Sequence, residues 1–183
     1  MGIDLVVHDK RLEGHTPTGD FQTMEVDEYT PLHQFVVWTL STIQCYGTID
    51  RLKLMAHGYE TDDGTLGYGM CFCDEGLNND TVYMLAPLKG LVNVIQLYSC
   101  GVANSSSDNM GTETKGDGFT FCRQLAQVTG AWVKASTATQ KYTKRINPWH
   151  WMEIDFGDWE GNVYWFSPDG VSVLNASPEA DPV

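Results

Sequence analysis

The sequence predicts an α/β domain built on a mainly parallel central sheet with helices on both faces. Two segments, residues 49–56 and 91–99, are almost continuously apolar, as strands covered on both sides are. Helical patterns at 30–47 and 119–128 separate these strands from the others. Parallel neighbours need crossover connections, so an alternation of strands and helices favours a parallel sheet.

The N-terminal elements are a strand and a helix. Residues 3–8 (IDLVVH) read as a short strand followed by a polar stretch. Thr30 before Pro31 fits a helix N-cap followed by a first-turn proline, and Gly47 ends the pattern. Apolar residues recur between them at helical spacing: Leu32, Phe35, Val36, Trp38, Leu40 and Ile43.

The central elements carry the two residues of greatest interest. Strand 49–56 stops at His57-Gly58, and strand 91–99 stops at Cys100-Gly101. Helix 119–128 ends before Gly130, in the usual place for a C-terminal glycine, and a third short strand is expected at 132–135.

The C-terminal third is expected to hold a β-hairpin. Two aromatic segments, 149–156 and 162–166, flank a turn that contains Gly157 and Gly161. The polar run 104–117 reads as a mobile surface loop that borders the site. Residues 167–183 contain three prolines and are expected to be a flexible tail.

Composition fits one domain and limits its partners. A chain of 183 residues with 42% hydrophobic residues can bury a real core, which we place at about 30–166. The net charge of −13 argues against nucleic acid or an anionic membrane and favours a basic protein or peptide. No secretory signal or membrane-spanning apolar run is found in the sequence.

Five cysteines, an odd number, indicate reduced thiols and a cytoplasmic setting rather than a disulfide framework. Cys71 and Cys73 have no second ligand pair at zinc-site spacing. We therefore expect no metal and no cofactor. The chain could equally be a piece of a larger secreted protein.

His57 and Cys100 are the candidate catalytic pair, because the carboxyl ends of neighbouring parallel strands meet at one rim. A thiol attacks a carbonyl as the thiolate, with a base nearby and backbone donors for the developing oxyanion. Gly58 and Gly101 leave the backbone open there. The amides of Gly58 and Cys100 are the candidate oxyanion donors.

These motifs resemble a known clan. LKLMAHG and IQLYSCG resemble the peptidase clan of caspases, gingipains, clostripain and the bacterial CHAT domains. LYSCGVA, FCRQLAQVTGAWVKAST and WHWMEIDFG are similar to a bacterial caspase-fold family of unassigned function, found in large surface or adhesin-like proteins. The resemblance covers about residues 49–156 and implies a caspase-like fold.

The resemblance also implies a substrate pocket. In the clan, the strand after the helix that follows the nucleophile helps to line it, a role that falls here on Ala135, Ser136 and Thr137. The clan's frequent preference for Arg or Lys, together with the negative charge, suggests cleavage after a basic residue. Asp108 and Asp117, in the loop after Cys100, are candidates for the acid of such a pocket.

Two functions from different classes follow. The first is a cysteine endopeptidase with Cys100 as nucleophile and His57 as general base and acid, acting on a peptide or protein. The second is a catalytically silent caspase-fold module that binds a protein, because a fold alone does not establish activity. A different thiol acyl-transfer enzyme, such as an amidase, is a third reading.

Other side chains have simpler interpretations. His150 could compete as a base, and the tryptophans around it could form a ligand platform, but packing explains aromatic strands more directly. Acidic clusters at 62–63 and 74–80 could collect calcium, but they match no EF-hand loop and read as solvated turns.

Overall fold

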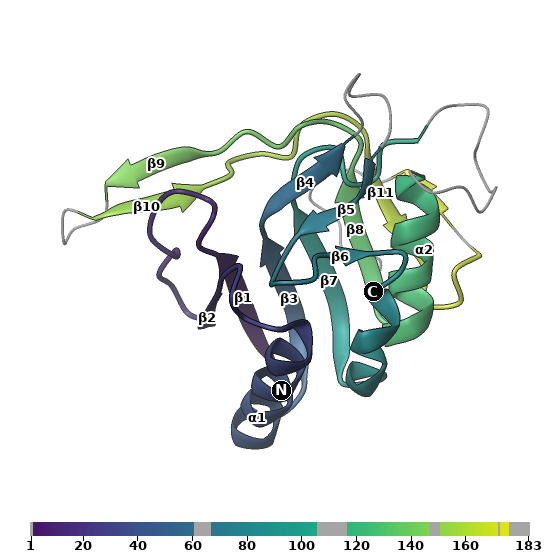
Figure 1. The fold of residues 1–183 in the computed structure, drawn as a ribbon, viewed down its shortest axis with the longest axis horizontal. Helices are drawn as coiled ribbons and strands as arrows, with labels where there is room; N and C mark the ends of the chain where they lie inside the picture. The colour runs from purple at the N-terminus through teal and green to yellow at the C-terminus, as the bar shows by residue number, and fades with distance from the viewer. Residues whose placement is uncertain (1, 61–66, 106–116, 147–150, 172, 176–183) are drawn as a thin grey trace.

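A computed structural model describes residues 2–60, 67–105, 117–146, 151–171 and 173–175. Its central sheet has seven strands: Ile3–Asp9 (β1), Gln22–Val26 (β2), Ile49–Met55 (β3), Val92–Tyr98 (β7), Trp132–Ser136 (β8), Val163–Phe166 (β11) and Val173–Asn175 (β12). Their spatial order is β12-β11-β8-β7-β3-β1-β2 (Figure 1).

The sheet is mainly parallel, as the sequence predicts. β2, β1, β3, β7 and β8 run parallel. At one edge, β11 pairs antiparallel with β8, and β12 pairs antiparallel with β11. β3 and β7 are interior neighbours, with Leu52 opposite Ile95 and Met55 opposite Tyr98. The predicted pairing of the two apolar segments is confirmed.

Both predicted helices are present. Leu32–Tyr46 (α1) follows Pro31, and Gly47, at φ 97°, ends it. Gly118–Thr129 (α2) begins at Asp117, whose carboxylate accepts the Phe119 amide, and ends at left-handed Gly130. A 3₁₀ helix, Val82–Leu88 (η1), precedes β7. Local cap chemistry therefore sets the ends of α2. The predicted N-cap at Thr30 is wrong, because Pro31 stands at the N-cap of α1 without a side-chain cap and the Leu32 amide donates to the distant Glu75 carboxylate at 2.7 Å.

The described helices cover only one face of the sheet, so the expectation of helices on both faces is wrong for this part of the chain (Figure 1). Leu52, Leu54 and Ile95 on that face form one core with buried side chains of all three helices: Phe35, Val36, Leu85, Leu88, Leu125 and Ala126. Sheet residues on the other face, Val6 and Met55, belong to a separate cluster with Leu12 and Ile154.

Strand order explains the one-sided covering. After β2, the chain advances through β3 and β7 to β8 in a single direction across the sheet. Crossovers between parallel strands are right-handed, so connections that advance the same way lie on the same face. The β1–β2 connection runs the opposite way and packs on the other face through Leu12 and Phe21. The sequence shows strand character but not this order.

Two small antiparallel sheets complete the fold. His57–Glu60 (β4), Gly67–Cys71 (β5) and Leu77–Asn78 (β6) form one, and Thr143–Ile146 (β9) pairs with Met152–Asp155 (β10) to form the other (Figure 1).

The predicted C-terminal hairpin between 149–156 and 162–166 is wrong. Its second segment, β11, pairs with β8 and β12, and its first contributes β10 to the pair with β9. Pairing with β8 buries Trp165 and Phe166 and covers a sheet edge that a local hairpin would leave open.

The ends of the chain extend the sheet. β1 is an interior strand, so the core includes the N-terminal residues before position 30. The expected flexible tail contributes β12 as an edge strand, and the residues beyond it lie outside the described part.

None of the five cysteines forms a disulfide bond. None of the described helices is both long and apolar enough to cross a membrane.

Candidate active site

His57 and Cys100 follow neighbouring strands at the carboxyl-end rim of the sheet. Met55 pairs with Tyr98, and the Ala56 amide donates to the Tyr98 carbonyl at 3.3 Å. His57 then opens β4, whereas Cys100 stands in the turn after β7. His57 is exposed and Cys100 is half-buried. Both residues are therefore at least partly exposed at this rim.

Gly58 packs directly on the main chain of Cys100. A Cβ at position 58 would overlap the Cys100 carbonyl oxygen and lie 3.1 Å from the Cys100 amide nitrogen. Only glycine permits this approach, because the obstacle is backbone that a rotamer change cannot move. The two amides proposed as oxyanion donors therefore belong to chain segments in direct contact.

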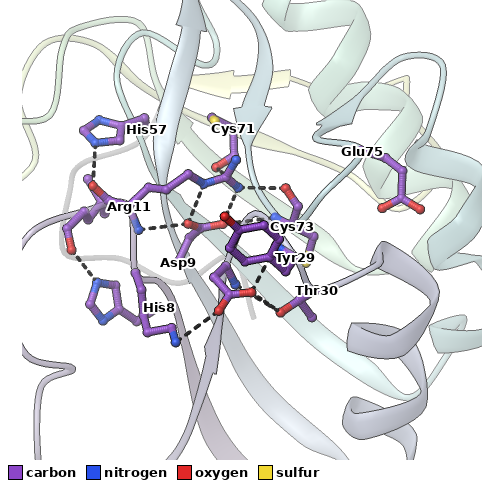
Figure 2. Close-up of polar contacts among 12 residues, drawn as sticks. His8, Asp9, Arg11, Tyr29, Thr30, His57, Cys71, Cys73 and Glu75 are labelled. Carbon is purple, nitrogen blue, oxygen red and sulfur yellow. Dashed lines mark hydrogen bonds and ion pairs between the residues drawn. The ribbon is translucent and has the colours of Figure 1, made fainter.

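The His57 ring is oriented by a backbone carbonyl. Its Nε2 lies 3.1 Å from the carbonyl oxygen of Arg11, in the turn after β1 (Figure 2). A carbonyl only accepts hydrogen bonds, so Nε2 carries the proton of the neutral ring. Nδ1 is then the lone-pair nitrogen, and it is the atom able to take a proton from a thiol.

Asp9 and Arg11 form a polar cluster beneath His57 that sequence reasoning missed. Their side chains make a two-point ion pair, with Nη2 and Oδ2 2.6 Å apart (Figure 2). The hydrogen bond with Asp9 is the main reason why the pKa of the Arg11 guanidinium lies above its ordinary value. The signal in the sequence was the charged triplet Asp9-Lys10-Arg11. It directly follows an apolar strand that ends at the same rim of the sheet as the strands before His57 and Cys100.

A second thiol, Cys71, also lies beside His57. The two residues are directly opposite in the β4–β5 ladder, which places their side chains on the same face of that ribbon. Cys71 also forms a hydrogen bond with Tyr59. Burial is the larger cause and this hydrogen bond the second cause that raise the pKa of Tyr59 to about 12. Cys71 is half-buried, so it is the natural comparison for any test of Cys100.

Two of the other thiols have environments that oppose ionisation. Burial raises the pKa of Cys73, and it raises that of the fully buried Cys122 as well. Nucleophilic thiols require the thiolate, so neither is suited to catalysis. Cys45 is exposed on α1.

The segment expected to line the substrate pocket does lie beside Cys100. The Gly101 amide donates to the Ala138 carbonyl at 3.0 Å, and the Ala103 amide donates to the Ser136 carbonyl at 3.1 Å. However, Ala135 is fully buried in the core, and the buried Ser136 hydroxyl donates to the Glu160 carbonyl. Of the three residues, only Thr137 offers a partly exposed side chain.

A cavity of about 270 Å³ lies on the helix-free face of the sheet, next to the rim. Met55 and Tyr98 line it and stand two residues before His57 and Cys100. Two residues of chain span at most about 7 Å, so the cavity and the candidate pair are close. Its wall also contains Phe156 and four charged side chains: Lys53, Arg145, Glu153 and Asp155.

Asp117 and three of the tryptophans lie in packed or capping positions. Asp117 caps α2 and is buried, so it is structural rather than a pocket acid. Trp165 is buried, whereas Trp159 stacks on Tyr98 with ring centroids 4.6 Å apart. Trp151 packs on His15 instead, with the centroids 4.8 Å apart. Of the three tryptophans placed here, Trp159 and Trp165 both contact Lys134, whereas Trp151 packs elsewhere, so the three do not form one platform.

Some expectations fall outside the described residues: His150 with Trp149, Asp108, the acidic pair 62–63 and most of loop 104–117. Within the described ranges, no group of three His, Cys, Asp or Glu side chains is arranged to hold a metal ion.

Comparisons with protein families, with curated proteins and with solved structures found no match to this chain.

Proposed function

We propose that the protein is a cysteine endopeptidase of the caspase type, with Cys100 as nucleophile and His57 as general base and acid. The observation that carries this proposal is the contact between Gly58 and Cys100. It brings two strand-end segments together at the rim where the Arg11 carbonyl orients His57. The one-sided helix layer departs from the expected caspase-like layering, so the proposal depends on the site.

The reaction follows from the roles of these groups. His57 Nδ1 takes the proton of the Cys100 thiol, and the thiolate sulfur attacks the carbonyl carbon of the scissile peptide bond. The amides of Gly58 and Cys100 stabilise the oxyanion that forms. His57 returns the proton to the leaving amine, which leaves a thioester. Water attacks the thioester, His57 takes its proton, and the acid product and free thiol are released.

The substrate class proposed is a peptide or protein cut after a basic residue. Asp155 lines the cavity beside the rim, and the rings of Tyr98 and Phe156 offer a surface for an aliphatic stem. Lys53 lies 3.9 Å from Asp4, and Arg145 is opposite Glu153 in the β9–β10 ladder. Both cations of the wall therefore have an acid beside them, and Asp155 is the carboxylate that we propose meets the basic side chain. The free thiols agree with a reducing, cytoplasmic setting.

A peptide-library digest tests this function. The wild type should cleave after Lys or Arg, and Cys100→Ala should lose turnover by at least about 1,000-fold while it keeps its fold. Cys45→Ala is the matched control, because it removes an exposed thiol on α1 and should cleave normally. Equal, negligible cleavage by all three proteins would favour the alternative of a catalytically silent protein-binding module.

A further inference from the structure

The cluster of Asp9 and Arg11 fixes the turn that carries the His57 acceptor. Arg11 Nε donates to Asp9 Oδ1 at 2.8 Å, and Nη2 donates to Oδ2 at 2.6 Å. The Arg11 amide also donates to Oδ1, at 3.1 Å. Side chain and main chain of one residue are thus tied to the same carboxylate, which leaves the Arg11 carbonyl little freedom (Figure 2).

The same cluster joins β1 to the chain around the end of β5. Arg11 Nη2 donates to the carbonyls of Cys71 and Cys73, at 3.1 and 2.7 Å. The Cys73 amide donates to Asp9 Oδ2 at 3.0 Å. Because Cys71 lies opposite His57 in the β4–β5 ladder, the cluster holds both the strand beside His57 and the acceptor of its ring.

The chemistry of the pair suits a rigid support. Asp9 is fully buried, and its carboxylate accepts four hydrogen bonds, three from Arg11 and one from Cys73. A guanidinium is a planar fork that can bind a carboxylate at two points and still reach further acceptors. A lysine in its place could not make this set of contacts.

We propose that Asp9 and Arg11 are positioning residues for His57, which hold the Arg11 carbonyl so that the ring keeps its proton on Nε2 and presents Nδ1 to the Cys100 thiol. The catalytic part of this inference rests on the proposed peptidase function. The tautomer part does not, because it concerns only His57 and the groups around it. Neither Asp9 nor Arg11 needs to contact a substrate in this role.

The direct test is the tautomer of His57 in ¹⁵N-labelled protein, read from long-range ¹H–¹⁵N correlations at about pH 8, where an ordinary histidine is neutral. His57→Gln assigns the signal. The wild type should show the Nε2–H form. In Asp9→Asn and Arg11→Lys the ring should become a mixture of tautomers, and peptide cleavage should fall by about 10- to 100-fold, as when other supporting partners are lost.

Asp4→Asn is the matched control. Asp4 stands on the same strand and pairs with Arg51 at 3.4 Å, but on the exposed part of the sheet, and its loss should leave the His57 tautomer unchanged. If Asp9→Asn fails to fold, Arg11→Lys decides, since it keeps a cation beside the buried carboxylate.

Folded Asp9→Asn or Arg11→Lys protein with the pure Nε2–H form and unaltered cleavage would overturn the proposal. A shifted tautomer in protein whose wild type cleaves nothing would support the positioning role and count against the peptidase function alone.

Discussion

At the scale of single residues, the site depends on close backbone contacts that exclude a side chain, above all at Gly58. Gly58 lies against the Cys100 backbone, so even the Cβ of alanine would push the two strand ends apart. His57 is held through a carbonyl rather than through a charged side chain. The sequence pointed to His57, Gly58 and Cys100 because each stands where an apolar strand stops.

Asp9 and Arg11 could not be recognised in the same way. A charged triplet after a strand is usually a solvated turn, and its spacing does not reveal that the chain after β5 folds against it. The missing information is a contact between segments 60 and more positions apart. Local patterns find strand ends, whereas tertiary pairing decides which polar groups are buried there.

Tyr59 gives a pH-dependent prediction at this scale. Its pKa is raised to about 12 in the folded protein, above the ordinary value of about 10 in the unfolded chain. The folded state therefore holds this proton more tightly, and the stability it contributes is present below about pH 10 and lost as the pH rises toward about 12.

Urea unfolding at about pH 9 and pH 11 checks this. Tyr59→Phe should lose less stability over that interval than the wild type. Tyr68→Phe, which removes a hydroxyl from the ring stacked on Tyr59 at 5.4 Å, should behave like the wild type. An identical pH response of wild type and Tyr59→Phe would refute the assignment.

At the scale of elements, boundaries were predictable and partners were not. Pro31, Gly47 and Gly130 mark helix ends through their own backbone preferences, so α1 and α2 follow from local sequence although Thr30 does not cap α1. The aromatic strands of the C-terminal third have no such local rule for pairing. A turn containing glycines favoured a hairpin, but β11 gains more burial by extending the central sheet at β8.

The N-cap of α2 gives a stability prediction. The buried Asp117 carboxylate accepts the Phe119 amide at 3.0 Å, the Thr120 hydroxyl at 3.0 Å and the Ser105 hydroxyl. Asp117→Ala should lower the free energy of unfolding by about 2 kcal/mol, since it removes the side-chain cap of α2 and the charged acceptor of three hydrogen bonds. Asp158→Ala, at an exposed turn position, should change it by less than about 0.5 kcal/mol. Equal effects in urea titrations would show that the cap contributes little.

At the scale of the whole molecule, strand order gives the site its surroundings. The connections that follow β1 and β3 leave the rim on opposite faces of the sheet. In an open α/β sheet, the carboxyl ends of strands whose connections diverge in this way are the usual place for a ligand. Arg11 follows β1 and His57 follows β3 at this point, and the cavity lies next to it on the opposite side of the sheet from the described helices.

The face of the sheet opposite the described helices is covered in part by aromatic side chains. Lys134 is buried there, with Nζ 5.1 Å from the ring centroid of Trp159 and 5.0 Å from that of Trp165. Cation–π contacts of this kind attract the ammonium group to the ring faces and so offset part of the cost of burying its charge. The sequence predicted a mostly parallel sheet correctly, but the covering of its faces depends on strand order, which periodicity does not encode.

The most direct test of the central claim, a reactive thiol at Cys100 supported by His57, is the alkylation rate of each cysteine at about pH 6, where an unassisted thiol with a pKa of about 8.5 is almost entirely protonated. Iodoacetamide labelling followed by peptide mass spectrometry resolves all five sites in one sample. Cys100 should react at least about tenfold faster than exposed Cys45 and half-buried Cys71, and His57→Gln should remove that advantage. Labelling of Cys100 no faster than that of Cys45, or a Cys100 rate unaffected by His57→Gln, would contradict the account.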